Sequence, residues 1–144
     1  MKTFEIFEKY ISVRKSIVKV EHVLTTINTQ LELDDTKFYS IYLCLHEAFI
    51  NAIYHGNLLD NSKYVELYVY VEDDVLTIQI TDQGEGVEVS KLPNPLNVEN
   101  FLKDSGRGIF LICHYTDNVK FEKNQRGFHV IMHFNMKKND DTQV

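Results

Sequence analysis

Residues 64–82 carry the pattern that most restricts the fold of this chain. Two runs of alternating side chains are separated by the pair Asp73-Asp74. Every second position is aliphatic: Val65, Leu67, Val69, Val71, Leu76, Ile78 and Ile80. A period of two is typical of strands that bury one face, so the pattern predicts a β-hairpin with one buried face.

The same alternation places Asp82 on the buried face, in phase with Ile78 and Ile80. A carboxylate in that position is costly unless it finds hydrogen-bond donors. One interpretation is that Asp82 caps the turn that follows. The other is that it forms the floor of a pocket and accepts a hydrogen bond from a ligand amine, such as that of adenine. Gly84 and Gly86 would then let the backbone approach the ligand closely.

Helices are expected before the hairpin, after a first strand at about residues 3–10. An apolar period of three or four residues begins near Val13 and indicates a helix to about residue 31. The segment Leu33-Asp34-Asp35 offers an N-cap for a second helix that runs to about His55, and Gly56 is a typical C-terminal stop. The core stripe of this second helix is formed by Ile41, Leu45, Ala48 and Ala52.

The second half of the chain predicts a lid, a short helix and another hairpin. Residues 87–105 are rich in Pro, Asn and charge, and such long connections are often lids. A helix is expected at 106–115, followed by strands near 119–122 and 128–134, and a frayed tail from Lys137. The predicted architecture is a two-layer α+β sandwich in a single domain, residues 1–144.

Charge, apolar runs and cysteine usage reduce the number of function classes that this chain could belong to. A net charge of −6 gives no electrostatic reason to expect nucleic acid or an anionic membrane as a partner. No apolar run approaches the roughly 20 residues of a membrane span, and the first residues lack the apolar block of a signal peptide. Cys44 and Cys113 are interpreted as two small buried thiols, which makes a reducing cytoplasm the expected compartment.

Glu47, Asn51 and His55 are spaced by four and share one stripe of the second helix. A solvated polar face is the ordinary explanation, but Asn is a poor residue within a helix unless it has a partner. An amide oxygen is a suitable ligand for Mg²⁺, which indicates Asn51, and Glu47 could orient or deprotonate a nucleophile. His55 is favoured as a charge at the helix C-terminus rather than as a catalyst.

The segment Ser105-Gly106-Arg107-Gly108 opens the predicted short helix. Ser105 at the cap and Gly106 in the first turn would leave free N–H groups at the positive end of the helix dipole, an anion site. Arg107 could add a charge-assisted contact to phosphate. A plain helix start, with glycines that permit close packing, explains the local sequence equally well.

Together these motifs resemble a known family. Glu47-Ala48-x-x-Asn51-Ala52, Asp82-x-Gly84-x-Gly86 and Gly106-Arg107-Gly108 are similar to the three nucleotide-binding boxes of the GHKL ATPases. Within that superfamily the chain resembles the bacterial anti-sigma-factor serine/threonine protein kinases, over nearly its whole length.

The resemblance implies helices over a mixed β-sheet, with ATP held between the second helix and the lid. It implies that Glu47 is the base on the acceptor hydroxyl, that Asn51 holds Mg²⁺ and that Asp82 binds the adenine amine. Gly84 and Gly86 would shape the adenine pocket, and the segment 106–108 would lie at the triphosphate. The implied partners are an anti-anti-sigma (STAS-type) protein that receives phosphate on a serine, a sigma factor that is sequestered, and a second copy in a homodimer.

One position departs from the family pattern, because Phe128 follows Gly127 where the family usually has threonine. Either the local register shifts by a residue or adenine is held less tightly. A nucleotide-binding regulatory module without kinase turnover is therefore the alternative function. The catalytic half of a histidine kinase is a further alternative, although His22 lacks the neighbours of a phosphoacceptor site.

Overall fold

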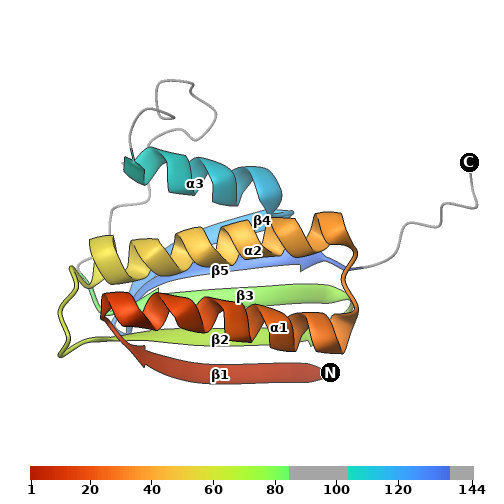
Figure 1. The fold of residues 1–144 in the computed structure, drawn as a ribbon, viewed down its shortest axis with the longest axis horizontal. Coiled ribbons are helices and arrows are strands. Elements are labelled where there is room, and N and C mark those ends of the chain that lie inside the picture. Colours follow the sequence, from red (N-terminus) through yellow and green to blue (C-terminus); the bar gives the residue numbers. More distant parts are fainter. Residues whose placement is uncertain (85–103, 137–144) are drawn as a thin grey trace, which may run out of the picture.

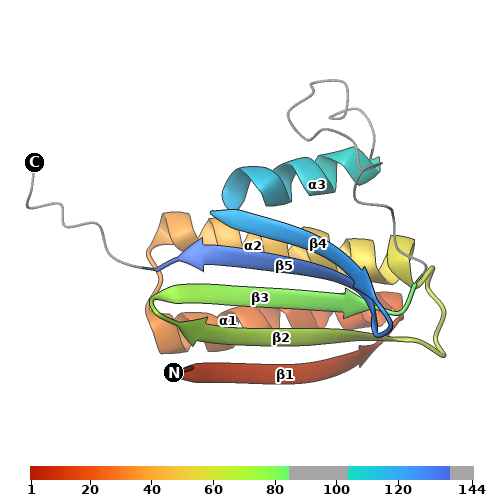
Figure 2. The same cartoon turned by 180° about the vertical axis from the view of Figure 1, so that it is seen from behind.

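The computed structural model describes residues 1–84 and 104–136. The greater part of the predicted lid, including Gly86, and the predicted tail from Lys137 lie outside these residues. The described part contains one five-stranded sheet in the order β1-β2-β3-β5-β4 (Figure 2). Its strands are β1 (Phe4–Ile11), β2 (Tyr64–Glu72), β3 (Val75–Asp82), β4 (Asn118–Asn124) and β5 (Gly127–Asn135).

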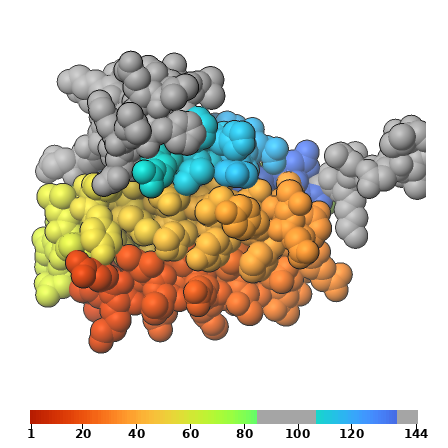
Figure 3. All heavy atoms as spheres, turned by 45° about the horizontal axis from the view of Figure 1, so that its top comes forward, coloured from red at the N-terminus to blue at the C-terminus, as the bar shows by residue number. Residues whose placement is uncertain are grey.

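The helices cover one face of this sheet (Figure 1). They are α1 (Lys19–Leu31), preceded by the 3₁₀ turn η1 (Arg14–Val18), then α2 (Asp35–Ile50), which continues into the π-helical turn η2 (Asn51–Gly56), and α3 (Asp104–Tyr115). Figure 3 shows α1 and α2 side by side on this helical face. Helix α3 packs against α2.

The predicted two-layer α+β sandwich is confirmed. All four described strand pairings are antiparallel, so the sheet is not mixed as the resemblance implies. Because neighbouring strands run in opposite directions, the end of β3 lies beside the start of β5, where Asp82 pairs with Phe128. This pairing places the start of the first glycine motif next to the closing hairpin.

Local signals account for the start of α2 and for its packing. The Oδ1 atom of Asp34 accepts a hydrogen bond from the backbone N–H of Lys37 at 2.8 Å, as expected of an N-cap. All four residues of the predicted core stripe are buried. They pack with the inward residues of the sheet and with α1 in one core, which contains Ile27, Ile41, Leu45, Phe49, Ile53, Leu67, Ile78, Ile80, Met132 and Phe134.

The end of the second helix differs from the prediction. The chain remains helical to Gly56, but from Asn51 it forms a π-helical turn. Gly56 does not adopt the left-handed conformation of a C-terminal glycine stop, because positive φ among the described glycines occurs at Gly127. Gly56 is instead required by packing, since a side chain there would overlap Asp82.

Two further expectations need correction. Helix α3 begins at Asp104, so Ser105 lies inside its first turn and not at the cap. Strand β3 is buried at two positions of its second face as well, because Thr77 and Thr81 are buried, while Gln79 between them is half-buried. The reason is its place in the sheet: β3 lies between β2 and β5, and His129 of β5 contacts Thr81.

Both cysteines are free thiols, with Cys44 buried and Cys113 half-buried. Burial raises the pKa of the Cys44 thiol to about 12, so this sulfur is a neutral packing group in α2. Among the described residues, no helix has the length and apolar character needed to cross a bilayer.

Candidate active site

Asp82 ends β3 and faces the helices, as the alternation predicts. It is 5% exposed. Within residues 1–84 and 104–136, its carboxylate accepts one hydrogen bond, from the backbone N–H of Gly84 to Oδ1 at 2.9 Å. Burial raises the pKa of this carboxyl above its ordinary value, against the opposing effects of the Gly84 N–H and of Lys123. The acid is thus buried with acceptor capacity to spare.

Three glycines surround Asp82 where a side chain could not fit. A Cβ at Gly56 would lie 2.3 Å from the carboxyl carbon of Asp82, and one at Gly84 would lie 1.9 Å from the carbonyl oxygen of Gly56. A Cβ at Gly127, whose φ is +138°, would lie 1.9 Å from the carbonyl oxygen of Asp82. The backbones of three segments therefore meet around one acid. Gly84 lies close to the backbone of Gly56, and its approach to a ligand stays a prediction.

Glu47 and Asn51 meet the glycine segment at Gly108. Both side chains are half-buried on one side of the second helix. A Cβ at Gly108 would lie 3.0 Å from Oε2 of Glu47 and 3.1 Å from Nδ2 of Asn51. Two motifs that are more than 50 residues apart in the sequence are therefore in contact, and the space between them is kept open by the absence of a side chain.

The Asp82 and Gly108 clusters lie at the same end of the molecule. In Figure 1 the C-terminal end of α2, the start of α3 and the end of β3 are all at the left. Arg107 is exposed in the first turns of α3, and His55 is exposed near the end of η2. Gly106 lies in the first turn of α3. The structure thus brings together Glu47, Asn51 and Gly108, and separately Asp82 with Gly84.

The residues present suit a Mg²⁺ ion that is held mainly by phosphates. In the described part of the chain, no three His, Cys, Asp or Glu residues are grouped as metal ligands. Asn51 offers an amide oxygen beside Gly108, with Glu47 next to it. Mg²⁺ commonly takes only one or two protein oxygens and keeps water and phosphate for the rest, so this sparse donor set fits.

Another hollow, of about 670 Å³, lies at the opposite end of the sheet. It is open to solvent and is lined by residues of the β2–β3 turn and of β4 and β5, among them Asp73, Asp74, Asp117 and His133. None of the residues that line it is a candidate site residue from the sequence analysis. The site at the Asp82 end is identified by its chemistry and its contacts, and this hollow adds nothing to it.

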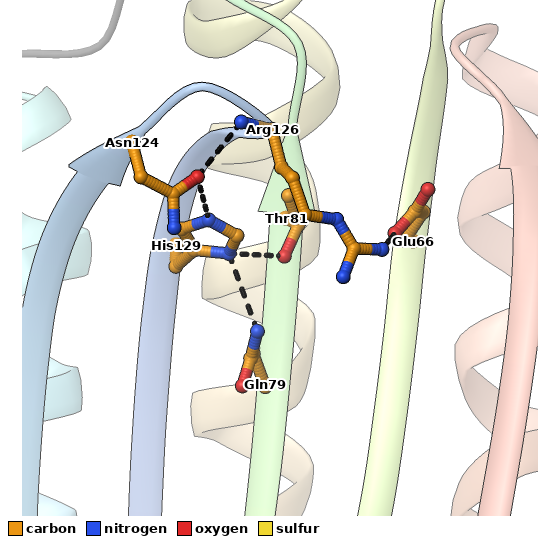
Figure 4. Close-up of polar contacts among 6 residues, drawn as sticks. All are labelled: Glu66, Gln79, Thr81, Asn124, Arg126 and His129. Atoms are coloured by element: carbon orange, nitrogen blue, oxygen red, sulfur yellow. Dashed lines mark hydrogen bonds and ion pairs between the residues drawn. The ribbon is translucent and has the colours of Figure 1, made fainter.

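Sequence reasoning missed a polar cluster on the open face of the sheet (Figure 4). His129 is buried, and its Nδ1 lies 2.7 Å from Oγ1 of Thr81 and 3.2 Å from Nε2 of Gln79. Its Nε2 lies 2.9 Å from Oδ1 of Asn124. Because an amide nitrogen can only donate, Nδ1 is the acceptor and Nε2 carries the proton. The one available signal was that His129 shares the parity of the outward residues of β5.

Phe128 occupies the position where the family pattern has threonine. It is buried directly opposite Asp82, on the same face of the sheet, and its ring stacks on Phe121 with centroids 6.4 Å apart. The chain thus places an aromatic ring, and no hydroxyl, beside the acid.

The relationship to known proteins agrees with this arrangement. Residues 13–134 match the family model of the histidine kinase-like ATPase domain. The chain belongs to this family. It is 34% identical over 104 residues to the anti-sigma F factor of Clostridium acetobutylicum, across 70% of this chain and 68% of that protein. It is 23% identical over 139 residues to the serine-protein kinase RsbW of Oceanobacillus iheyensis, across 92% of this chain and 87% of that protein.

A solved structure supports the fold. The crystal structure of the RsbU and RsbW domains of a Mycobacterium tuberculosis protein matches with a TM-score of 0.66 at 13% identity, over 95% of this chain and 34% of that one. The resemblance to the anti-sigma-factor serine kinases of the GHKL superfamily is confirmed. These relatives support a function in kinase and anti-sigma activity.

Proposed function

We propose that this chain is an ATP-dependent serine/threonine protein kinase that phosphorylates an anti-anti-sigma (STAS-type) protein and also sequesters a sigma factor. The observation that carries the proposal is the inward carboxylate of Asp82. It is buried among backbone atoms, and its pKa is raised by burial. It receives a hydrogen bond from Gly84. An acid kept in that state serves a ligand that brings its own donor, and the exocyclic amine of adenine is such a donor.

The second part of the site would handle the phosphates. We propose that Asn51 holds Mg²⁺ and that Ser105, Gly106, Arg107 and Gly108 lie at the triphosphate with the N-terminal turns of α3. The support is the contact of Gly108 with both Glu47 and Asn51. When bound, Mg²⁺ supplies charge neutralisation on the phosphate oxygens.

Glu47 would act as the general base. Its carboxylate lies beside Gly108, where a phosphate would be presented to the acceptor serine. Phosphoryl transfer depends mainly on positioning and charge, so the role of Glu47 is to accept the proton of the serine hydroxyl as the oxygen attacks. Gly84 and Gly86 would border the adenine ring, and His55 would contribute a favourable charge near the helix end.

A homodimer is part of the proposal. The open face of β1 and β2 presents apolar side chains, with Phe7 58% exposed and Tyr64 41% exposed. Basic and acidic groups are mixed on the same strands, including Lys9 and Glu66. A two-fold interface needs one surface that complements itself, and this mixture provides it. Phe7→Glu should shift the sedimentation coefficient to that of a monomer, whereas Tyr39→Glu on the helical face should not.

The decisive test of the kinase proposal is Glu47→Gln. The variant should lower phosphate transfer to an anti-anti-sigma protein by about 10²- to 10⁴-fold, because the base is lost. Its affinity for Mg²⁺-ATP should stay within about 3-fold of the wild type, because the charge it loses does not contact adenine. Glu21→Gln, on the exposed side of α1, is the matched control and should change neither quantity.

Other outcomes point elsewhere. Normal transfer by Glu47→Gln would remove Glu47 from the base role. Tight Mg²⁺-ATP binding by the wild type, with no transfer to any serine-bearing partner, would favour the regulatory module without turnover. A phosphoprotein that loses its label in acid would indicate phosphohistidine and a histidine kinase, because phosphoserine survives acid.

A further inference from the structure

Asn57, directly after η2, is a fully buried polar residue at the meeting point of three chain segments. It is 0% exposed. Its Nδ2 donates to the carbonyl oxygen of Tyr64 at 3.0 Å, and its Oδ1 accepts from the backbone N–H of Gln83 at 2.7 Å. Its own backbone N–H donates to the carbonyl oxygen of Ala52 at 2.8 Å. One side chain therefore joins the helix end to the start of β2 and the end of β3.

The connection is closed by a third bond. The backbone N–H of Tyr64 donates to Oε1 of Gln83 at 2.6 Å, so Asn57, Tyr64 and Gln83 form a ring of three hydrogen bonds. A ring of this kind fixes the separation of its members more tightly than any single bond, because each bond restricts the other two. The three bonds therefore fix the position of the Gln83 backbone relative to Asn57.

This ring of hydrogen bonds lies next to Asp82, and both segments that it joins adjoin the acid. Asp82 precedes Gln83, and Gly56 precedes Asn57. The carboxyl group of Asp82 lies so close to Gly56 that a Cβ there would be 2.3 Å from its carbon. Gly84, on the other side of Gln83, touches the carbonyl of Gly56. The Asn57–Gln83 bond thus holds residues 56–57 against residues 82–84, with the acid between them.

Backbone strain after Asn57 shows that the turn needs such a clamp. Leu58 and Leu59 have φ values of 54° and 57°, in the left-handed region that is strained for a non-glycine residue. Leu58 is 74% exposed, so burial of its side chain does not offset that strain. Such strain persists where the surrounding structure determines the conformation, and here the buried bonds of Asn57 do so.

We infer that Asn57 is a positioning residue for nucleotide recognition: it fixes the direction of the Asp82 carboxylate without contacting the nucleotide. The inference rests on the proposed function of Asp82. It assigns a role to a residue outside the three motifs, and it explains why a buried amide with both ends paired follows the helix that carries Glu47 and Asn51.

A double-mutant cycle tests it, with ATP affinity measured by calorimetry for the wild type, Asn57→Ala, Asp82→Asn and the double variant. Asn57→Ala should weaken ATP binding by about 10-fold in the wild-type background and by less than about 3-fold in the Asp82→Asn background. Equal weakening in both backgrounds would show a structural effect only and overturn the inference. The matched control is Asn28→Ala, which removes a comparable side-chain bond to the Leu33 N–H at the far end of α1. It should leave ATP affinity unchanged.

If Asn57→Ala does not fold, Asn57→Ser takes its place in the cycle, because it is uncharged and keeps a polar group in the buried position but is too short to bond both Gln83 and Tyr64. The same coupling with Asp82 is then expected, and additive effects overturn the inference. The two proposals fail in different ways. An Asp82→Asn variant with wild-type ATP affinity removes the proposed function itself, whereas additivity in the presence of a strong Asp82 effect removes only the role of Asn57.

Discussion

Asp82 and His129 lie one register position apart at the same end of the sheet, yet they face opposite sides of it. They are 5% and 4% exposed. His129, on the open face, has side-chain partners on both ring nitrogens. Asp82, on the helical face, accepts one hydrogen bond from the described residues, although a carboxylate can accept about four. The comparison separates a buried polar group whose bonding is complete within the protein from one that keeps free acceptor positions among residues 1–84 and 104–136, as the proposed binding of adenine needs.

Burial acts on both groups in the direction of the neutral form. It raises the pKa of the Asp82 carboxyl and lowers the pKa of the His129 imidazole. For His129, the hydrogen bonds need a neutral ring that accepts at Nδ1 and donates at Nε2. Burial and hydrogen bonding therefore both favour the neutral form. For Asp82 the charged form is the better acceptor for an amine, so burial opposes the proposed binding of adenine. Such a conflict is expected where an acid is kept for a ligand, because the buried charge lowers the stability of the ligand-free protein.

The largest effect is expected for Asp82→Asn. The variant should lose about 10- to 100-fold in ATP affinity, because an amide N–H would face the adenine amine. The ligand-free variant should be at least as stable as the wild type at pH 7. The reason is that an acid with a raised pKa loses stabilising effect as the pH rises from about 4 through that pKa.

Calorimetric titration and urea unfolding at pH 4 and pH 7 measure these two effects. Asp74→Asn, in the β2–β3 turn at the opposite end of the molecule, is the control and should preserve ATP affinity. A ligand-free Asp82→Asn protein that is clearly less stable than the wild type at pH 7 would mean that Asp82 is a structural cap.

A smaller effect on binding is expected for Phe128→Thr, next to Asp82 on the same face. A hydroxyl in place of the ring adds a polar partner for the nucleotide, and ATP affinity should rise by up to about 10-fold. The ring packing against Phe121 is lost, so the melting temperature should fall. Phe128→Leu separates the two causes, since it reduces the ring without adding a hydroxyl. An equal gain in affinity by both variants would show that size matters here and the hydroxyl does not.

His129→Gln should act on stability and leave ATP affinity within about 3-fold of the wild type. Loss of the three-partner cluster should cost about 1–3 kcal/mol of unfolding free energy at pH 7.5. Because the pKa of His129 is lowered, its stabilising effect is present above its ordinary pKa of about 6.5 and is lost as the pH falls through the lowered pKa. The difference between wild type and variant should therefore shrink from pH 7.5 to pH 5.

Urea unfolding across that range provides the measurement. His133 also has a lowered pKa, but it is present in both proteins and does not enter the difference. A difference that stays constant with pH would contradict the assignment of a neutral, fully bonded imidazole.

The smallest effect is expected for Arg126→Ala. The guanidinium Nη2 lies 3.1 Å from Oε2 of Glu66, but the Arg126 side chain is 70% exposed. Exposed ion pairs contribute about 0–1 kcal/mol, so the melting temperature should change by a few degrees at most. The His129 cluster should survive, because the bond from Arg126 to Asn124 comes from its backbone N–H. A loss as large as that of His129→Gln would show that the cluster depends on the ion pair.

The part of this arrangement that sequence could predict follows from local periodicity. The alternation in residues 64–82 puts Asp82 on the inner face, and the structure confirms it. The spacing of Ile41, Leu45, Ala48 and Ala52 correctly gives the core stripe of the second helix, and the cap lies in the predicted segment 33–35, at Asp34. Each of these depends on residues that are near in the chain, where geometry is set by the repeat of the helix or strand.

The remainder depends on partners that are distant in the sequence. Thr81 is buried because His129 lies opposite it, 48 residues later. Asn57 pairs with Gln83, and the alternation pattern does not record that bond. The π-helical turn that begins at Asn51 does not alter the spacing of the apolar residues, so the sequence pattern gives no sign of it. Gly56 was predicted as a helix stop for its conformational freedom, whereas its role is to leave room for Asp82.

The most direct measurement compares the affinities of ATP and inosine triphosphate for the wild type and for Asp82→Asn. The two nucleotides differ at position 6 of the purine, which carries an amine in ATP and a carbonyl oxygen in inosine triphosphate. The wild type should prefer ATP by about 10- to 100-fold, and the variant should lose or reverse that preference. Equal binding of both nucleotides by the wild type, or an undiminished preference in the variant, would contradict adenine recognition by Asp82.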